Sequence, residues 1–199
     1  WGLPSTNQEK IQGAFYGACV ERCQPLMGFL LSGLSQKEAV AITQTLPIIY
    51  EDEWLIAVNK PTGLLSIPGR YRDVQDSVLS RLRHLLPNGE SLLAVHRLDR
   101  NTSGVLVLAR DRQTHSQLSQ QFEHRRVHKV YEAMLNGSVV EEQGVIDLPL
   151  WGDPHDRPIL GDRLYGSASD DRLHLHAREL SFEHPQSKQI LHLRVDTPF

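Results

Sequence analysis

From residue 48 onward, apolar and polar residues alternate over short stretches, a pattern that predicts β-strands. Residues 48–50 and 54–59 flank a polar turn at 51–53 and are typical of a β-hairpin. Further strands are expected at 92–95, 105–109 and 130–135. Near the end of the chain, two alternating runs on either side of a His-Pro-Gln-Ser turn at 184–187 predict a second hairpin.

Two stretches have the period of an amphipathic helix. The first follows Asp73, a candidate N-cap, and Pro-Asn-Gly at 87–89 ends it. Its apolar face comprises Val74, Val78, Leu82, Leu85 and Leu86. The second follows Asp111, another candidate N-cap, with Thr114, Leu118 and Phe122 at four-residue spacing. Single helices among hairpins indicate an α+β fold, a largely antiparallel mixed sheet with a few flanking helices.

The first 46 residues differ from the rest of the chain. They contain helical stretches and few charges, and they carry no catalytic pattern. We expect 1–46 to be the tail of an upstream domain or an N-terminal appendage, and 47–199 to be a separate domain. The chain begins with Trp1 and not Met, so we also expect further sequence before it.

Charge is unevenly distributed along the chain. The net charge of the 199 residues is −3, yet residues 60–130 contain 12 Lys and Arg against 6 Asp and Glu. A basic stripe on an acidic protein is a candidate phosphate-binding surface, and an ordinary solvated surface of mixed sign is the alternative. No apolar run reaches membrane-spanning length and no signal peptide is evident, so a cytoplasmic protein without a membrane partner is expected.

Metal and cofactor chemistry find little support in the sequence. The ten histidines form no recognised ligand motif, and Cys19 and Cys23 are spaced unlike a common zinc pair. No glycine-rich phosphate loop and no nucleophile elbow are present. These patterns favour neither a metal centre nor another cofactor.

The most informative stretch is His-Arg-Leu-Asp-Arg-Asn-Thr-Ser-Gly at residues 96–104, a tight turn with a strand on either side. Asp99 lies in this turn between Arg97 and Arg100, whose charges favour an ionised carboxylate. Thr102 and Ser103 offer hydroxyl groups to the turn or to Asp99 itself. Such an aspartate can be a nucleophile, a general base or a metal ligand, and a purely structural ion pair is the alternative.

The same stretch strongly resembles the signature of pseudouridine synthases of the ribosomal large subunit synthase A type. Other stretches are similar to that family in the same order, from about residue 47 to Phe199. They are VNKPTGLLSIPGR at 58–70, HKVYEAMLNG at 128–137, PILGDRLYG at 158–166 and RLHLHARELSFEHP at 172–185. The resemblance implies the pseudouridine synthase catalytic fold and isomerisation of uridines in 23S ribosomal RNA, transfer RNA or both.

The resemblance also implies roles for individual residues. Asp99 corresponds to the nucleophile, which attacks either carbon 6 of uracil or the anomeric carbon of the sugar. Arg97 takes the place of the flipped-out base, and Tyr131 stacks on the uracil. The alternative for Tyr131 is a purely structural role in the sheet core. His96, Arg100, Thr102 and Lys60 are further candidates for substrate binding, with Lys60 supporting the site or its backbone. Candidates for phosphate contact are Arg110, Arg112, Arg125, Arg126 and Lys129, each of which has a solvated surface position as its alternative.

The resemblance breaks near residues 157–159. Members of the family have several dozen residues there, with a Gly-Arg-Thr-His-Gln-x-Arg motif whose basic residue pairs with the aspartate, and this chain has no such motif. Because both flanks match well, we favour a stretch of the natural protein being absent from this sequence. The alternative is a real loss, which leaves a catalytically impaired RNA-binding protein. An unrelated aspartate-dependent hydrolase is a remote third hypothesis, while the target uridine and the oligomeric state stay open.

Overall fold

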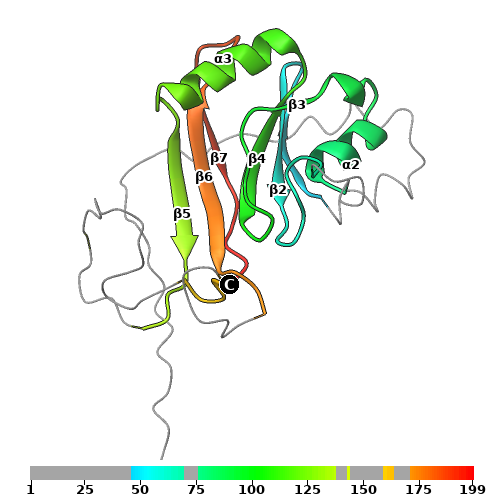
Figure 1. Ribbon diagram of the computed structural model, residues 1–199. Coiled ribbons are helices and arrows are strands. Elements are labelled where there is room, and N and C mark those ends of the chain that lie inside the picture. Colours follow the sequence, from blue (N-terminus) through cyan, green and yellow to red (C-terminus); the bar gives the residue numbers. More distant parts are fainter. Residues whose placement is uncertain (1–45, 70–75, 138–142, 144–158, 164–170) are drawn as a thin grey trace, which may run out of the picture.

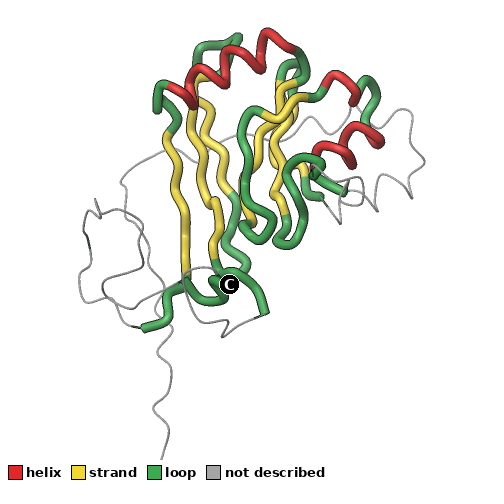
Figure 2. The backbone as a smooth tube through the Cα atoms, in the orientation of Figure 1, coloured by secondary structure: helices red, strands yellow, loops and turns green. Residues whose placement is uncertain are grey.

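The structure is a computed structural model, and it describes residues 46–69, 76–137, 143, 159–163 and 171–199. The first half of the described chain forms β1 (Ile48–Glu51), β2 (Leu55–Lys60), α2 (Val78–Leu85), η1 (Gly89–Ser91), β3 (Leu93–Ala94) and β4 (Ser103–Ala109). It continues with α3 (Arg112–Glu123), β5 (His128–Ala133), β6 (Leu175–Glu183) and β7 (Ile190–Arg194). Strands dominate and the helices are few (Figure 2), which confirms the expected α+β class.

The seven strands form one sheet that divides into two antiparallel parts. β1, β2, β3 and β4 make up the first sub-sheet, and β5, β6 and β7 make up the second. The two parts meet where β4 pairs with β6 in parallel over only two residue pairs, Ser103 with His176 and Gly104 with Ala177. We call this short contact the seam. Figure 1 shows the two sub-sheets side by side, with α3 lying across their upper end.

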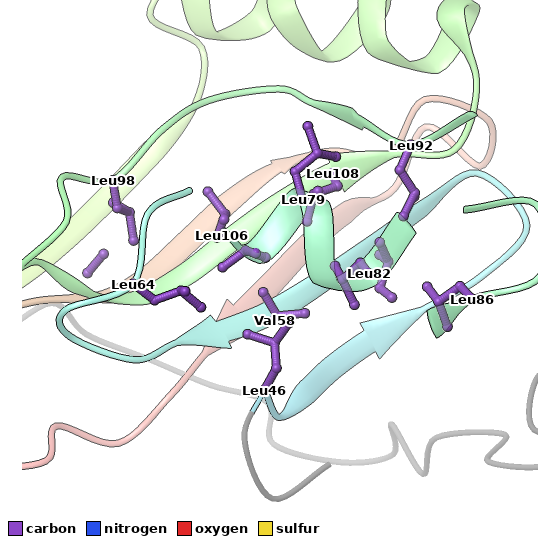
Figure 3. Close-up of a cluster of buried hydrophobic side chains, with 13 residues drawn as sticks. Leu46, Val58, Leu64, Leu79, Leu82, Leu86, Leu92, Leu98, Leu106 and Leu108 are labelled. Carbon is purple, nitrogen blue, oxygen red and sulfur yellow. The ribbon is translucent and has the colours of Figure 1, made fainter. Parts of the chain in front are cut away.

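Each face of the sheet carries its own hydrophobic core. On one face, α2 packs against alternate residues of β2 and β4, including Val58, Leu106 and Leu108 (Figure 3). On the other face, Leu118 of α3 packs with Val105 and Val107 of β4 and with buried residues of β6 and β7. The side-chain period of two in β4 therefore serves both cores, which explains why all seven of its residues are buried.

The expected N-cap of the second helix is confirmed, whereas the expected start of the first is wrong. Asp111 accepts a hydrogen bond from the N–H of Thr114 at 2.8 Å and caps α3. α2, however, begins at Val78 and is capped by Ser77, whose hydroxyl accepts from the N–H of Ser80. The Ser80 hydroxyl in turn accepts from the N–H of Ser77, so two serines three residues apart form a capping box. Asp73 itself lies outside the described residues.

The predicted strands are present with shifted ends. β4 begins at Ser103, two residues earlier than expected, because the seam with β6 extends it. β5 spans His128–Ala133 and not 130–135, because its hydrogen-bonded partner β6 runs from the level of Ser181 to that of Leu175. Leu135 makes only an isolated bridge with Ile159. Tertiary pairing thus decided the ends of these strands.

Several expectations concern parts of the chain outside the described residues. They include the appendage at 1–45 with Cys19 and Cys23, and positions 157 and 158 of the expected missing segment. No helix among the described residues is both long and apolar enough to span a bilayer.

Candidate active site

Asp99 lies in the loop that connects β3 to β4, and a second loop, residues 60–66, holds it in place. Leu98, next to Asp99, is buried in the core between the α2 face and the sheet (Figure 3). The buried hydroxyl of Ser66 donates to the carbonyl oxygen of Leu98 at 2.7 Å and accepts from its N–H at 3.0 Å. Both backbone groups of the residue before Asp99 are therefore fixed by one side chain.

Residues after Asp99 are attached to the same loop. The N–H of Gly63 donates to the carbonyl oxygen of Arg100 at 2.8 Å, and Nε of Arg100 donates to the carbonyl oxygen of Gly63 at 2.9 Å. The Thr62 hydroxyl donates to the carbonyl oxygen of Asn101 at 2.8 Å. Contacts on both sides of Asp99 leave its backbone little freedom, which lowers the entropy lost when a substrate is positioned against it.

Lys60 is a buried cation beneath these two loops. Its Nζ donates to the carbonyl oxygens of Pro61 at 2.9 Å, Leu64 at 2.7 Å and Arg100 at 3.1 Å, and the side chain is fully buried. Burial lowers the pKa of Lys60 to about 8, while the negative charge of Asp99 acts in the opposite direction. Lys60 thus binds loop backbone, and its expected role in substrate binding stays a prediction.

The carboxylate of Asp99 is exposed to solvent. Within the described part of the chain, neither a hydrogen bond nor an ion pair engages its oxygens. Nε of Arg100 donates to the carbonyl oxygen of Gly63 instead, and the side chain of Arg97 is exposed. The N–H of buried Thr102 donates to the carbonyl oxygen of Asp99 at 3.1 Å, so Thr102 closes the turn through its backbone.

The sheet places Lys60 and Tyr131 at the two ends of one row of paired residues. Lys60 pairs with Gly104, Gly104 with Ala177 and Ala177 with Tyr131, so the four residues form one row across β2, β4, β6 and β5. Tyr131 is 46% exposed. Its pKa is raised, first by partial burial and then by the charge of Asp99. The charge of Asp99 therefore acts on the pKa of both residues at the ends of the row, Lys60 and Tyr131.

His96 is engaged within the protein. Its Nε2 accepts a hydrogen bond from the N–H of Val107 at 3.1 Å, and its ring stacks on Phe122 with centroids 4.7 Å apart. Burial and then the charge of Lys129 lower the pKa of His96 to about 4, so the ring is neutral at physiological pH. The structure thus indicates a role for His96 in holding the start of the loop, whereas its expected role in substrate binding stays a prediction.

The candidate phosphate contacts do not form one group. Arg110 lies at the far end of β4 and forms an ion pair with Glu51. Arg125 and Arg126 are exposed in the turn after α3, and Lys129 on β5 has its Nζ 4.9 Å from the centre of the Phe122 ring. Arg112 is exposed in the first turn of α3. Of the five candidates, only Lys129 is recorded against the same Phe122 ring as His96, at the start of the Asp99 loop.

A cleft of about 310 Å³ opens beside the loops, within the size range of small-ligand sites. Its walls include Asn59, Thr62, Ser103, His176 and Phe199. A larger hollow of about 420 Å³ lies at the α3 and β6–β7 end of the sheet, away from Asp99. The smaller cleft lies beside the segments that hold or follow the Asp99 loop, but Asp99 and Tyr131 are not among its walls.

Sequence reasoning missed several residues that build the site. Ser66, Thr62 and Gly63 fix the Asp99 loop, and His176 bonds Ser103 across the seam. The sequence signal for the first three is their place in the stretch 58–70, which resembles a family motif. Among the described residues, no group of three or more His, Cys, Asp or Glu side chains could hold a metal ion.

Comparisons with known proteins point to one family. A family model described as RNA pseudouridylate synthase matches residues 54–189. The dual-specificity RNA pseudouridine synthase RluA of Vibrio parahaemolyticus is 34% identical over 211 positions, which include 76% of this chain and 83% of the relative. RluA of Escherichia coli is 43% identical over 113 residues, 57% of this chain and 50% of that protein. The structure of human RNA pseudouridylate synthase domain containing 1 has the same fold, with a TM-score of 0.57, 21% identity and coverage of 77% of this chain and 84% of that one.

The alignment with the Vibrio protein also contains many positions that this chain lacks. It extends over 211 positions, whereas 76% of the 199 residues is about 151, so about 60 aligned positions have no counterpart in this chain. This size agrees with the several dozen residues expected from the motif pattern. That these positions lie together near residues 157–159 stays a prediction.

Proposed function

Because the chain belongs to the RNA pseudouridylate synthase family, it is an RNA-modifying isomerase, and we propose that Asp99 is its nucleophile. The observation that carries the proposal is an exposed carboxylate on a loop whose backbone is fixed on both sides. A held carboxylate without a competing cation is suited to attack a carbon electrophile. Carbon 6 of uracil and the anomeric carbon of the ribose are the two candidate electrophiles.

The proposed reaction needs no redox partner. The bond between the ribose and N1 of uracil breaks, the base rotates, and a bond forms between the ribose and C5. C5 loses its proton and N1 gains one, so atoms and electrons balance within the substrate. The target base must leave its stack first, at a cost of a few kcal/mol.

Two further residues take part in this proposal. Tyr131 presents an exposed ring beside the charge of Asp99, where it can stack on the extruded uracil. Arg97 is exposed two residues before Asp99, where its guanidinium plane can fill the space that the base leaves.

For the substrate, we propose both ribosomal and transfer RNA. The RluA relatives are named as enzymes of dual specificity, and the alignment with the Vibrio protein includes most of both chains. A cytoplasmic location follows from these proposed substrates.

Asp99→Asn tests the nucleophile. The substitution keeps the size of the side chain and removes the charge, so we expect turnover to fall at least about 10³-fold. The Kd for the RNA should stay within about threefold, because the phosphate contacts that dominate RNA affinity are unchanged. Tritium release from RNA labelled at C5 of uridine measures turnover, and filter binding measures the Kd. Retained turnover in Asp99→Asn would reject the assignment, and the exposed Glu53→Gln variant is the matched control.

A catalytically impaired RNA-binding protein is the second candidate. It is favoured by the roughly 60 unmatched alignment positions and by the lack of a cation on the Asp99 carboxylate among the described residues. Under this alternative, the wild-type chain binds RNA and releases no tritium even in single-turnover reactions with excess protein. The two candidates are therefore separated by the wild-type measurement alone.

A further inference from the structure

The seam is a narrow connection between the two sub-sheets. β2 and β4 share six residue pairs, and so do β5 and β6, whereas β4 and β6 share only two. A two-pair parallel contact offers few backbone hydrogen bonds to resist sliding or rotation. Additional contacts at this place therefore have a large effect on how the two sub-sheets are oriented.

The proposed active site straddles the seam. Lys60 and the loop with Asp99 belong to the first sub-sheet, and Tyr131 belongs to the second. The relative position of Asp99 and Tyr131 consequently depends on the seam between them (Figure 1).

One pair of side chains joins the two sides at this point. The Ser103 hydroxyl and Nδ1 of His176 are 2.8 Å apart and hydrogen-bonded, and both side chains are buried. Ser103 is the fourth residue after Asp99, while His176 pairs with Glu132, the residue after Tyr131. The bond therefore links the segment that follows the nucleophile to the strand that carries the tyrosine.

We propose that the hydrogen bond between Ser103 and His176 is a positioning device that sets Tyr131 against Asp99 across the seam. The proposal rests on the function assigned above to those two residues. Neither Ser103 nor His176 is a catalytic residue in this proposal, since each acts through the backbone next to it. Burial lowers the pKa of His176 and the Glu132 carboxylate opposes this, so a neutral imidazole forms the bond under physiological conditions.

The backbone geometry makes this bond difficult to replace. Gly104 has a φ of 118°, and a Cβ atom there would lie 2.2 Å from the carbonyl oxygen of Ala177. The two backbones thus touch directly beside the Ser103–His176 pair, and a shift of either strand changes this contact and the hydrogen bond together. Errors of about 1 Å in the placement of catalytic groups can cost about a hundredfold in rate.

Kinetics of three variants test the proposal. We expect Ser103→Ala and His176→Gln each to lower kcat about ten- to hundredfold with little change in KM. His176→Asn should restore most of the activity, because its amide occupies the place of Nδ1, whereas the amide of Gln occupies the place of Nε2. The Ser103→Ala/His176→Gln double variant should be no worse than either single variant, because both remove the same bond.

A second measurement does not depend on turnover. Asp99 contributes to the raised pKa of Tyr131, so misplacing Tyr131 should bring that pKa closer to its ordinary value. An ultraviolet titration of tyrosine in the Ser103→Ala variant, with Tyr131→Phe to assign the signal, measures this change. Asp99→Asn gives the reference for complete loss of the interaction.

The outcomes distinguish this inference from the proposed function. All variants are assayed at a temperature where circular dichroism shows them folded. Folded Ser103→Ala with wild-type kcat and an unchanged Tyr131 titration overturns the positioning role, while inactive Asp99→Asn in the same series still supports the nucleophile. Active Asp99→Asn overturns the proposed function instead. If no protein in the series turns over RNA, the tyrosine titration alone decides the positioning role.

Discussion

At the scale of single residues, the candidate site depends on side chains that hold backbone more than on side chains that face solvent. The ammonium group of Lys60 donates to three loop carbonyl oxygens, and the hydroxyl of Ser66 bonds both backbone groups of Leu98. His96 is the third example, since its ring joins the start of the Asp99 loop to β4. Such residues immobilise Asp99 without touching its carboxylate.

The lowered pKa of His96 makes the free energy of unfolding depend on pH in the acidic range. Its pKa is lowered from 6.5 to about 4 by burial and then by the charge of Lys129. Between these two values the unfolded chain holds a proton on this ring and the native protein does not. The contribution of His96 to the free energy of unfolding is therefore present above pH 6.5 and is lost as the pH falls toward 4.

His96→Gln removes this titration and retains an acceptor near the N–H of Val107. Between about pH 7 and about pH 4.5, we expect wild-type protein to lose about 2 kcal/mol more unfolding free energy than the variant does. Urea denaturation at both pH values measures the difference. The exposed His84→Gln serves as control and should follow wild type. Equal pH dependence in wild type and His96→Gln would contradict the assignment.

At the scale of elements, β4 connects the parts of the molecule. It pairs with β2 along its length, with β3 at one end and with β6 at the other, and its residues alternate between the two cores. Its first two residues, Ser103 and Gly104, also end the loop that bears Asp99. The alternation predicted a strand here, but the seam with β6, where Ser103 meets His176 73 residues further along the chain, was not visible in the local pattern.

Glycine at position 104 is required by the seam. Gly104→Ala combines a φ of 118° with a Cβ atom 2.2 Å from the backbone of Ala177. We expect it to lower the free energy of unfolding by about 3 kcal/mol or more. Gly63→Ala is the matched comparison, with a φ of 81° but open space around the added atom, and should cost about 1 kcal/mol. Thermal denaturation followed by circular dichroism compares them, and equal losses would show that the close approach at the seam is unimportant.

At the scale of the whole molecule, the two sub-sheets are held together again at the end away from the seam. His184 follows β6, and its Nε2 lies 2.7 Å from Oδ2 of Asp52, in the turn between β1 and β2. Asp52 also accepts from the N–H groups of Trp54 and Leu55 at 2.8 Å each. In addition, Gln121 of α3 exchanges two hydrogen bonds with the backbone of Glu183, so α3 is attached to the second sub-sheet.

The His184–Asp52 contact should stabilise the whole fold. His184→Ala removes one of the two partners of Asp52 Oδ2, which keeps the Tyr50 hydroxyl, and leaves two N–H groups of the β6–β7 turn without their acceptor. We expect a loss of about 2–4 kcal/mol in unfolding free energy. Lys188→Ala, in the same turn, removes only an exposed ion pair with Glu183 and should change stability by less than about 1 kcal/mol. Urea denaturation measures both, and similar small losses would mean that the far end of the sheet is held by other contacts.

By itself, the sequence determined the strands, the helix around 112–122, the α+β class and the stretch that carries Asp99, because these depend on local periodicity, turn residues and one contiguous signature. Only the tertiary structure decided that Ser66, Lys60 and Gly63 hold that stretch, and that His176 meets Ser103. These contacts join residues about 30 to 70 positions apart, and their geometry follows from strand pairing, which no local pattern encodes. Both Asp73 and Ser77 are residue types that cap helices, so the local sequence allows either start. Only the folded chain shows that Ser77, with Ser80, caps α2.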